Sequence, residues 1–216
     1  MWTGKNMINP GILTFREYAM DESLPLTLLH QAVLDFLQGR SDVIVFGAQA
    51  VNAYVNEARM TQDIDLISIH AQELAEELRQ HLHDKFQIAV RIRNVANGRG
   101  FRIFQIRKSG NRHLIDIRAV DTLPDSERIS NILVMSPPEL IASKVISYYR
   151  RRGKPKSGSD WRDIAMLLLT FPTLKTDSGE VLARLQASDP TSEILSLWRD
   201  IVAKEIVAED DEDEFM

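Results

Sequence analysis

The sequence contains no cysteine among its 216 residues. This absence excludes disulfide bonds, thiolate catalysis and cysteine-ligated zinc sites. No stretch approaches the roughly 20 apolar residues that are needed to span a bilayer. The N-terminus also lacks the basic stretch and apolar segment of a secretory signal. We therefore expect a cytoplasmic protein without a membrane-spanning segment.

A general attraction to nucleic acid is missing as well, because the net charge is -5 at pH 7. The charge is unevenly distributed, since residues 209–214 carry six acids whereas residues 148–156 ("YYRRRGKPK") are strongly basic. Apolar residues make up 44% of the chain, which is an ordinary globular composition. The length allows one large domain, or a core domain with a smaller appendage.

Hydrophobic periodicity predicts a mixed α/β region followed by a helical region. In the first part we expect helices over residues 24–38, 48–58 and 71–86, and strands over residues 42–47, 58–69, 86–95, 100–108 and 112–120. In the second part we expect helices over residues 135–152, 159–171, 177–187 and 190–207. These elements predict an α/β core over residues 1–125, with about the first 22 residues loosely packed, a helical region over 126–208 and an acidic disordered tail over 209–216.

Two aspartates, Asp63 and Asp65, lie inside the apolar stretch "ARMTQDIDLISI" of residues 58–69. Residues two apart on a strand point to the same face, so these carboxylates are expected to project together. Two close carboxylates repel each other, and a cation such as Mg²⁺ between them relieves that cost. The alternative is that both lie at an exposed strand end and pair with arginines.

Two further features favour a metal site. Gly47 links the strand over residues 42–47 to the following helix, and a backbone turn beside a helix N-terminus is suited to binding phosphate. Asp116 is a lone acid in a later apolar strand. A third carboxylate on a neighbouring strand would complete a clamp for two metal ions.

The order of these features resembles the nucleotidyltransferase superfamily of the DNA polymerase β type. Within that superfamily, the sequence is most similar to the minimal AbiEii-type toxin nucleotidyltransferases. The matching residues of the aspartate motif are Arg59, Thr61, Asp63, Ile64, Asp65 and Leu66. A helical segment with a lysine, a basic turn and an Asp-x-x-Asp pair also resembles this group, at Lys144, Arg150 to Arg152, Asp160 and Asp163. The resemblance covers roughly residues 40–170.

The resemblance implies an α+β fold, in which a mixed sheet of about five strands is backed by helices and a C-terminal helical region follows. It implies Mg²⁺ or Mn²⁺ bound by Asp63, Asp65 and Asp116, and a nucleoside triphosphate (NTP) held near Gly47 and Ala48. The implied reaction transfers a nucleotidyl group to a hydroxyl of a protein, an RNA such as tRNA, or a small molecule. It also implies a toxin of a toxin–antitoxin or phage-defence system, with an antitoxin-like protein as partner.

One departure from the superfamily pattern is Ala48, because classical members follow the glycine with a serine that helps to bind the phosphates. The AbiEii-like branch, which this sequence resembles, often has a small residue there. Only backbone N–H groups would then serve the triphosphate. The alternative function is a binding module of the same fold, weak or inactive in catalysis, that acts through a partner protein. A metal-dependent phosphohydrolase would use the same carboxylates but needs a water-positioning base that the sequence does not reveal.

The remaining candidates for nucleotide binding each have an ordinary structural alternative. Arg59 and Thr61 belong to the aspartate motif, and Arg59 can contact phosphate or pair with a carboxylate of the metal site. Lys144 can bind phosphate or lie on the surface of its helix. Asp160 and Asp163 share a helix face and can orient Lys144, or Asp160 can cap the helix.

The five histidines show no spacing typical of metal ligands, and we interpret them as surface or ordinary core residues. The basic segment over residues 150–156 could bind RNA phosphates. A solvated loop between two helices is the interpretation we favour for it, because no aromatic residues are interleaved for base stacking.

Overall fold

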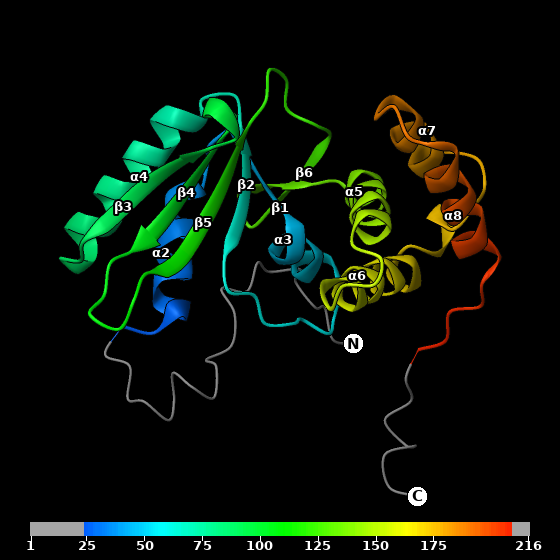
Figure 1. The fold of residues 1–216 in the computed structure, drawn as a ribbon, viewed down its shortest axis with the longest axis horizontal. Coiled ribbons are helices and arrows are strands. Elements are labelled where there is room, and N and C mark those ends of the chain that lie inside the picture. The colour runs from blue at the N-terminus through cyan, green and yellow to red at the C-terminus, as the bar shows by residue number, and fades with distance from the viewer. Residues whose placement is uncertain (1–23, 209–216) are drawn as a thin grey trace, which may run out of the picture. The chain divides into compact units, whose positions relative to one another are not determined.

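The computed structural model describes residues 24–208 (Figure 1). The predictions of a loosely packed N-terminus and of an acidic disordered tail therefore concern residues outside the described range. Within that range, the chain forms two compact units on either side of the Ser136–Pro137 bond. No helix of the described residues is long and apolar enough to cross a membrane.

The first unit is built on a mixed sheet of seven strands in the order β3-β4-β5-β2-β1-β7-β6. The strands are β1 (Val43–Phe46), β2 (Ile64–Ser68), β3 (Val90–Val95), β4 (Gly100–Gln105), β5 (Arg112–Ala119), β6 (Ser126–Ile129) and β7 (Ile132–Met135). β2 is antiparallel to β1 and parallel to β5, and β1 is parallel to β7. This arrangement of strands and helices confirms the predicted α+β fold.

Three helices accompany this sheet, namely α2 (Leu26–Leu37), α3 (Gly47–Tyr54) and α4 (Ala71–Phe86). α4 packs on β3, β4 and β5, and α2 packs on α4 and β5, so these two helices form one layer (Figure 1). The helix α4 has an apolar stripe at helical spacing, whose members Leu74, Leu78 and Leu82 are fully buried. Burying a leucine side chain contributes about 1.5–3 kcal/mol, so this stripe fixes α4 on the sheet.

Among residues 24–208, the helices α2 and α4 leave the other face of the outer strands uncovered. Along β4, Phe101, Ile103 and Gln105 are buried, whereas Arg102 is exposed and Phe104 is partly exposed. Alternate residues of a strand point to opposite faces, so the buried set faces the helices and the remaining set faces away from them. The candidate acids lie on the face of Arg102, because Asp116 is its partner in register on β5.

The second unit is helical and contains α5 (Pro137–Arg150), α6 (Lys156–Thr170), α7 (Glu180–Ala187) and α8 (Ser192–Ala203). Trp198 of α8 is fully buried, and its Nε1–H donates a hydrogen bond to the Thr176 carbonyl oxygen at 3.1 Å. This pairing satisfies the indole donor, which burial would otherwise leave without a partner at a cost of about 1–3 kcal/mol.

Two details differ from the sequence-based expectations. The sheet has seven strands rather than about five. The two additional strands, β6 and β7, form a hairpin whose short and partly polar sequence does not indicate strands. Its turn residues Ser130 and Asn131 both have positive φ, as a tight hairpin turn requires. The helix α6 begins at Lys156, so Asp160 lies inside the helix and the prediction that it caps the helix is wrong.

Candidate active site

The two strands that carry the candidate acids are direct neighbours. β2 and β5 run parallel, and Asp65 lies opposite Asp116 in their register. β2 begins at Ile64, so Asp63 immediately precedes the strand instead of lying within it. Asp65 and Asp116 are therefore neighbours on adjacent strands, and Asp63 directly precedes the strand of Asp65. The strand pairing explains how acids from two segments of the chain come to lie side by side.

The glycine turn is held against the same acids. Phe46, the last residue of β1, lies opposite Asp65, so the next residue, Gly47, reaches the Asp65 side chain. A Cβ atom at Gly47 would lie 2.8 Å from the Asp65 Cγ and 2.9 Å from its Cβ. Gly47 also has φ of +72°, in the left-handed region that favours glycine. Both constraints require glycine here. Ala48 follows as the second residue of α3 and is buried.

A β-bulge brings a histidine into the same cluster. Ile103 of β4 lies opposite Ile115, but the next residue, Phe104, lies opposite His113, so Leu114 is an extra residue on β5. As a result, two consecutive residues of β5, Leu114 and Ile115, are both fully buried. Residues three apart would normally point to opposite faces of a strand. The extra residue places His113 and Asp116 on the same face.

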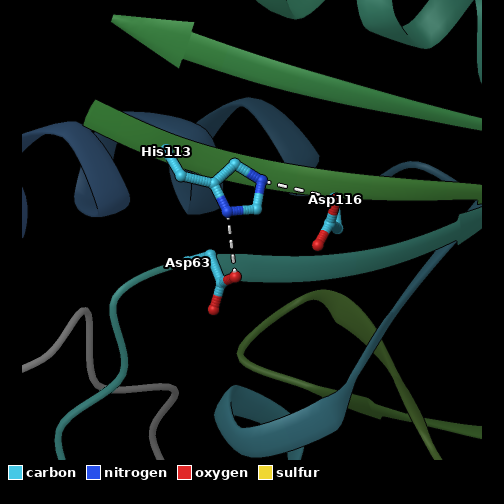
Figure 2. Close-up of side chains that lie close together, drawn as sticks. All are labelled: Asp63, His113 and Asp116. Atoms are coloured by element: carbon cyan, nitrogen blue, oxygen red, sulfur yellow. Dashed lines mark ion pairs between the residues drawn. The ribbon is translucent and has the colours of Figure 1, made fainter. Parts of the chain in front are cut away.

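The imidazole of His113 lies between two of the carboxylates, as Figure 2 shows. Its Nδ1 is 3.2 Å from Asp63 Oδ2, and its Nε2 is 3.4 Å from Asp116 Oδ1. Asp116 first, and Asp63 second, raise the pKa of His113 from 6.5 to about 9, although partial burial opposes this shift. The ring is therefore a cation at neutral pH and holds the two acids together.

Arg102 supplies a second cation to the cluster. Its Nε donates a hydrogen bond to Asp116 Oδ1 at 2.9 Å, from the position directly opposite on β4. The side chains of Arg102 and Asp116 are 47% and 29% exposed, so solvent weakens this ion pair. Asp116 thus contacts a guanidinium and an imidazolium in the structure without ligands.

The donor set fits a divalent metal ion. Asp63, His113 and Asp116 can each offer one ligand atom, and these atoms all lie within 4.8 Å of one another. As an imidazolium, the ring supplies positive charge to both carboxylates. Carboxylate oxygens suit Mg²⁺ and Mn²⁺, and an imidazole nitrogen additionally suits transition metals. Asp65, opposite Asp116, is placed to add a further carboxylate.

The loop before β2 is fastened by side chains of the predicted motif and of α3. The Asn52 side chain accepts a hydrogen bond from the Arg59 backbone N–H at 3.0 Å and donates one to its carbonyl oxygen at 2.8 Å. The Thr61 hydroxyl donates to the Asp63 carbonyl oxygen at 2.8 Å. Thr61 therefore shapes the turn that presents Asp63, whereas the guanidinium of Arg59 donates to the Met60 carbonyl oxygen at 3.4 Å.

The comparison with protein families decides among the possible interpretations of this fold and site. The family described as "Nucleotidyl transferase AbiEii toxin, Type IV TA system" matches residues 32–215 of the chain. The chain belongs to this nucleotidyltransferase family. The match confirms the resemblance that was inferred from the aspartate motif, and membership supports nucleotidyl transfer as the general activity. Among curated proteins, none matches the sequence significantly.

Solved structures show the same fold at low sequence identity. The Megavirus polyadenylate synthase is 16% identical with a TM-score of 0.57, and the likeness covers 71% of this chain and 33% of the viral chain. This AbiEii-family chain thus corresponds to about a third of that enzyme. JHP933 from Helicobacter pylori is 11% identical with a TM-score of 0.52, over 89% of this chain and 92% of its own.

The candidate residues in the helical unit form two ion pairs, Lys144 with Asp163 and Asp160 with Arg151. Lys144 is buried, not on the surface, and its Nζ lies 2.6 Å from Oδ2 of Asp163, which is fully buried. Both carboxylate oxygens of Asp160 accept from Arg151, at 3.0 and 3.1 Å. The first pair joins α5 to α6 and the second joins the turn after α5 to α6, and both offset the desolvation of the buried charges. A role for Lys144, Asp160 and Asp163 in nucleotide binding stays a prediction.

His113 is the site residue to which the sequence analysis gave no role. It lies three residues before Asp116, a spacing that a regular strand would place on the opposite face. The available signal was the pair Leu114 and Ile115, two consecutive apolar residues inside an otherwise alternating strand. Such a break in alternation is typical of a β-bulge, and it could have placed the ring beside the acid.

The glycine turn generates the first prediction. In Gly47→Ala, the left-handed conformation costs about 1–2 kcal/mol, and the collision with Asp65 adds about 1–3 kcal/mol of overpacking. Gly39→Ala is the matched control, because Gly39 has φ of +76° but its added Cβ would meet only Asn131 Nδ2, at 3.7 Å. Chemical denaturation should show about 3 kcal/mol lost in Gly47→Ala and about 1 kcal/mol in the control. Equal losses in the two variants would contradict the tight contact with Asp65.

The histidine generates a prediction of pH dependence in metal-free protein. Because the folded-state pKa of His113 is raised from 6.5 to about 9, its contribution to stability is complete below pH 6.5 and is lost as the pH rises through 9. The free energy of unfolding, measured with a chelator present, should exceed that of His113→Asn most at pH 6. The difference should shrink towards pH 9.5. A difference that stays constant across this range would show that the ring is not held as a cation between the acids.

Proposed function

We propose that this protein transfers a nucleotidyl group from an NTP to a hydroxyl acceptor, with Mg²⁺ or Mn²⁺ held by Asp63, Asp65 and Asp116. The observation that supports this proposal is the placement of Asp65 against the Gly47 turn and opposite Asp116, which lies close to Asp63. A divalent cation bound there would neutralise charge on the phosphates during the reaction. The protein's own task is mostly to position the reacting groups.

The proposed reaction is a displacement at phosphorus. The acceptor hydroxyl oxygen forms a bond to the α-phosphorus, and the bond between that phosphorus and the bridging oxygen to the β-phosphate breaks. Pyrophosphate leaves with that oxygen and its electron pair. The hydroxyl proton passes to a carboxylate, for which we propose Asp116, because it lies on the strand beside Asp65 and is partly exposed.

We assign the triphosphate to the turn at Gly47 and Ala48. Ala48 offers no hydroxyl, so backbone N–H groups of the first turn of α3 would bind the phosphates. The residue before the turn, Phe46, has no side chain that could cap the helix. In this proposal Thr61 holds Asp63 in place through its backbone, and Arg59 lies in the same loop with a side chain that can reach phosphate.

The family description also names a toxin of a type IV toxin–antitoxin system. We extend this role to the protein, which would then modify a component of its own cell in the cytoplasm and be opposed by an antitoxin protein. Protein, RNA and small molecules all carry hydroxyls that could accept the nucleotidyl group.

Ligand-dependent stability tests the proposed site directly. Mg²⁺ with each of the four NTPs should raise the melting temperature for at least one nucleotide, since a ligand at 100 times its dissociation constant adds about 2.7 kcal/mol to the free energy of unfolding. Asp65→Asn should lose this gain, because the carboxylate beside the glycine turn is removed while its shape is kept.

Asp84→Asn is the matched control, because Asp84 is exposed on α4 and its carboxylate accepts a hydrogen bond from Gln80, four residues earlier on the helix. This variant should keep the full gain of the unmodified protein. A protein that gains no stability from any NTP would contradict the enzyme proposal and favour a binding module that acts through a partner. An equal gain in Asp65→Asn and the control would place the nucleotide elsewhere.

A further inference from the structure

Arg118 projects from the same face of the sheet as the candidate acids. It lies on β5 two residues after Asp116, and alternate residues of a strand share a face. Arg118 is exposed, whereas Ile117 between the two is buried on the opposite face. The side chain of Arg118 therefore lies beside the acids and is accessible to a ligand of the site.

An aromatic ring holds the guanidinium of Arg118 towards the glycine turn. The guanidinium carbon lies 4.9 Å from the centre of the Phe46 ring. Because the strand order is β5-β2-β1, the side chain of Arg118 extends across β2, which carries Asp65, to reach Phe46 on β1. Gly47 directly follows Phe46, so the contact brings a positive charge to the turn at which the triphosphate is proposed to bind.

The charge of Arg118 is not neutralised by the part of the chain that the structure describes. Its guanidinium forms no ion pair or hydrogen bond within residues 24–208. Arg102 on the same face differs, because it donates a hydrogen bond to Asp116. A ring face orients a guanidinium without neutralising it, so the N–H donors of Arg118 stay available. A cation fixed in this way beside a metal-binding site is suited to an anionic ligand.

The glycine turn itself offers no side-chain donor to such a ligand. The first two residues of α3 are Gly47 and Ala48, and Phe46 before them makes no side-chain cap. Backbone N–H groups carry only partial charge, whereas a triphosphate carries several full negative charges. A guanidinium supplies a full positive charge and can donate two parallel hydrogen bonds to one phosphate. Arg118 is therefore placed to provide the side-chain contact that the turn lacks.

The position of Arg118 along β5 indicates which phosphates it can contact. Residues two apart on a strand are about 6.8 Å apart, so Arg118 lies next to Asp116 but beyond it. In the proposed reaction, the α-phosphorus is attacked beside the acids. A group bound by Arg118 would lie next to the reacting phosphorus and not at it, which fits the β- and γ-phosphates. These two phosphates leave together as pyrophosphate, and they gain negative charge as the bond to the α-phosphorus breaks.

We propose that Arg118, oriented by Phe46, binds the β- and γ-phosphates of the NTP and stabilises the pyrophosphate that leaves. The proposal rests on the proposed function, because it assigns a residue to the substrate of that reaction. The guanidinium stays protonated throughout and neutralises charge on the leaving oxygen, whose bond to the α-phosphorus breaks. Phe46 is a positioning residue, since it acts on the substrate only through Arg118.

The affinities of the triphosphate and the monophosphate of one nucleoside test this role. Isothermal titration calorimetry with Mg²⁺ uses analogues of ATP, GTP, CTP and UTP that cannot be cleaved between the α- and β-phosphates, followed by the monophosphate of the nucleoside that binds. Arg118→Gln should weaken the triphosphate analogue at least about tenfold, as expected for lost hydrogen bonds to a charged group. Monophosphate binding should change less than about twofold. Arg118→Lys keeps the charge without the planar fork, and its affinity should be intermediate.

Three further variants separate the contact from general charge and from packing. Arg91→Gln removes the same charge from an exposed arginine of the edge strand β3, and should leave both affinities within about twofold of the unmodified protein. Phe46→Leu should weaken the triphosphate analogue about threefold or more. Phe46→Leu combined with Arg118→Gln should lose no more than Arg118→Gln alone, because the ring acts through the guanidinium. Melting temperatures without ligand establish that each variant is folded.

Three results would overturn the inference. Arg118→Gln could bind the triphosphate analogue as tightly as the unmodified protein, it could weaken the triphosphate and the monophosphate equally, or Arg91→Gln could cause the same loss. Each of these results requires that the unmodified protein binds one of the analogues, so the proposed function would stand and only the role of Arg118 would be removed. An unmodified protein that binds none of the four analogues would contradict the proposed function itself, and this inference with it.

Discussion

The architecture of the site depends on one electrostatic constraint, which is that clustered carboxylates at one end of a strand pair need positive charge between them. The parallel pairing of β2 with β5 places Asp65 beside Asp116, and the turn before β2 adds Asp63. In the structure without ligands, the imidazolium of His113 and the guanidinium of Arg102 supply that charge. In the proposed function, a metal ion with bound phosphates would replace these internal cations, because it would neutralise the same oxygens at closer range.

Much of this arrangement could be predicted from the sequence, because its periodicity and motifs are local. The helix over residues 71–86 agrees with the structure, the strand predicted over 42–47 corresponds to β1 (Val43–Phe46), and the aspartate motif indicated the family. His113 could not be predicted in the same way, because its place depends on a one-residue bulge in β5. The surface alternative for Lys144 is wrong, since its burial against Asp163 depends on how two helices pack.

The two faces of the sheet differ in composition and in their contribution to stability. Apolar residues of β4 and β5 pack under α2 and α4 and supply most of the stability of this region, whereas the opposite face carries charge that contributes little to folding. Exposed arginines on the edge strand β3 also discourage the pairing of this sheet with another sheet. This face therefore has few constraints from folding.

The central claim, that Asp63, Asp65 and Asp116 together hold a divalent cation with the nucleotide, is tested most directly by crystallography with Mn²⁺. Crystals grown with Mn²⁺ and an NTP analogue that cannot be cleaved between the α- and β-phosphates should give an anomalous difference peak among the three carboxylates. The account predicts that His113 or Arg102 then withdraws from Asp116 and that phosphate oxygens complete the coordination. Manganese bound only elsewhere, with the His113 bridge unchanged, would contradict the account.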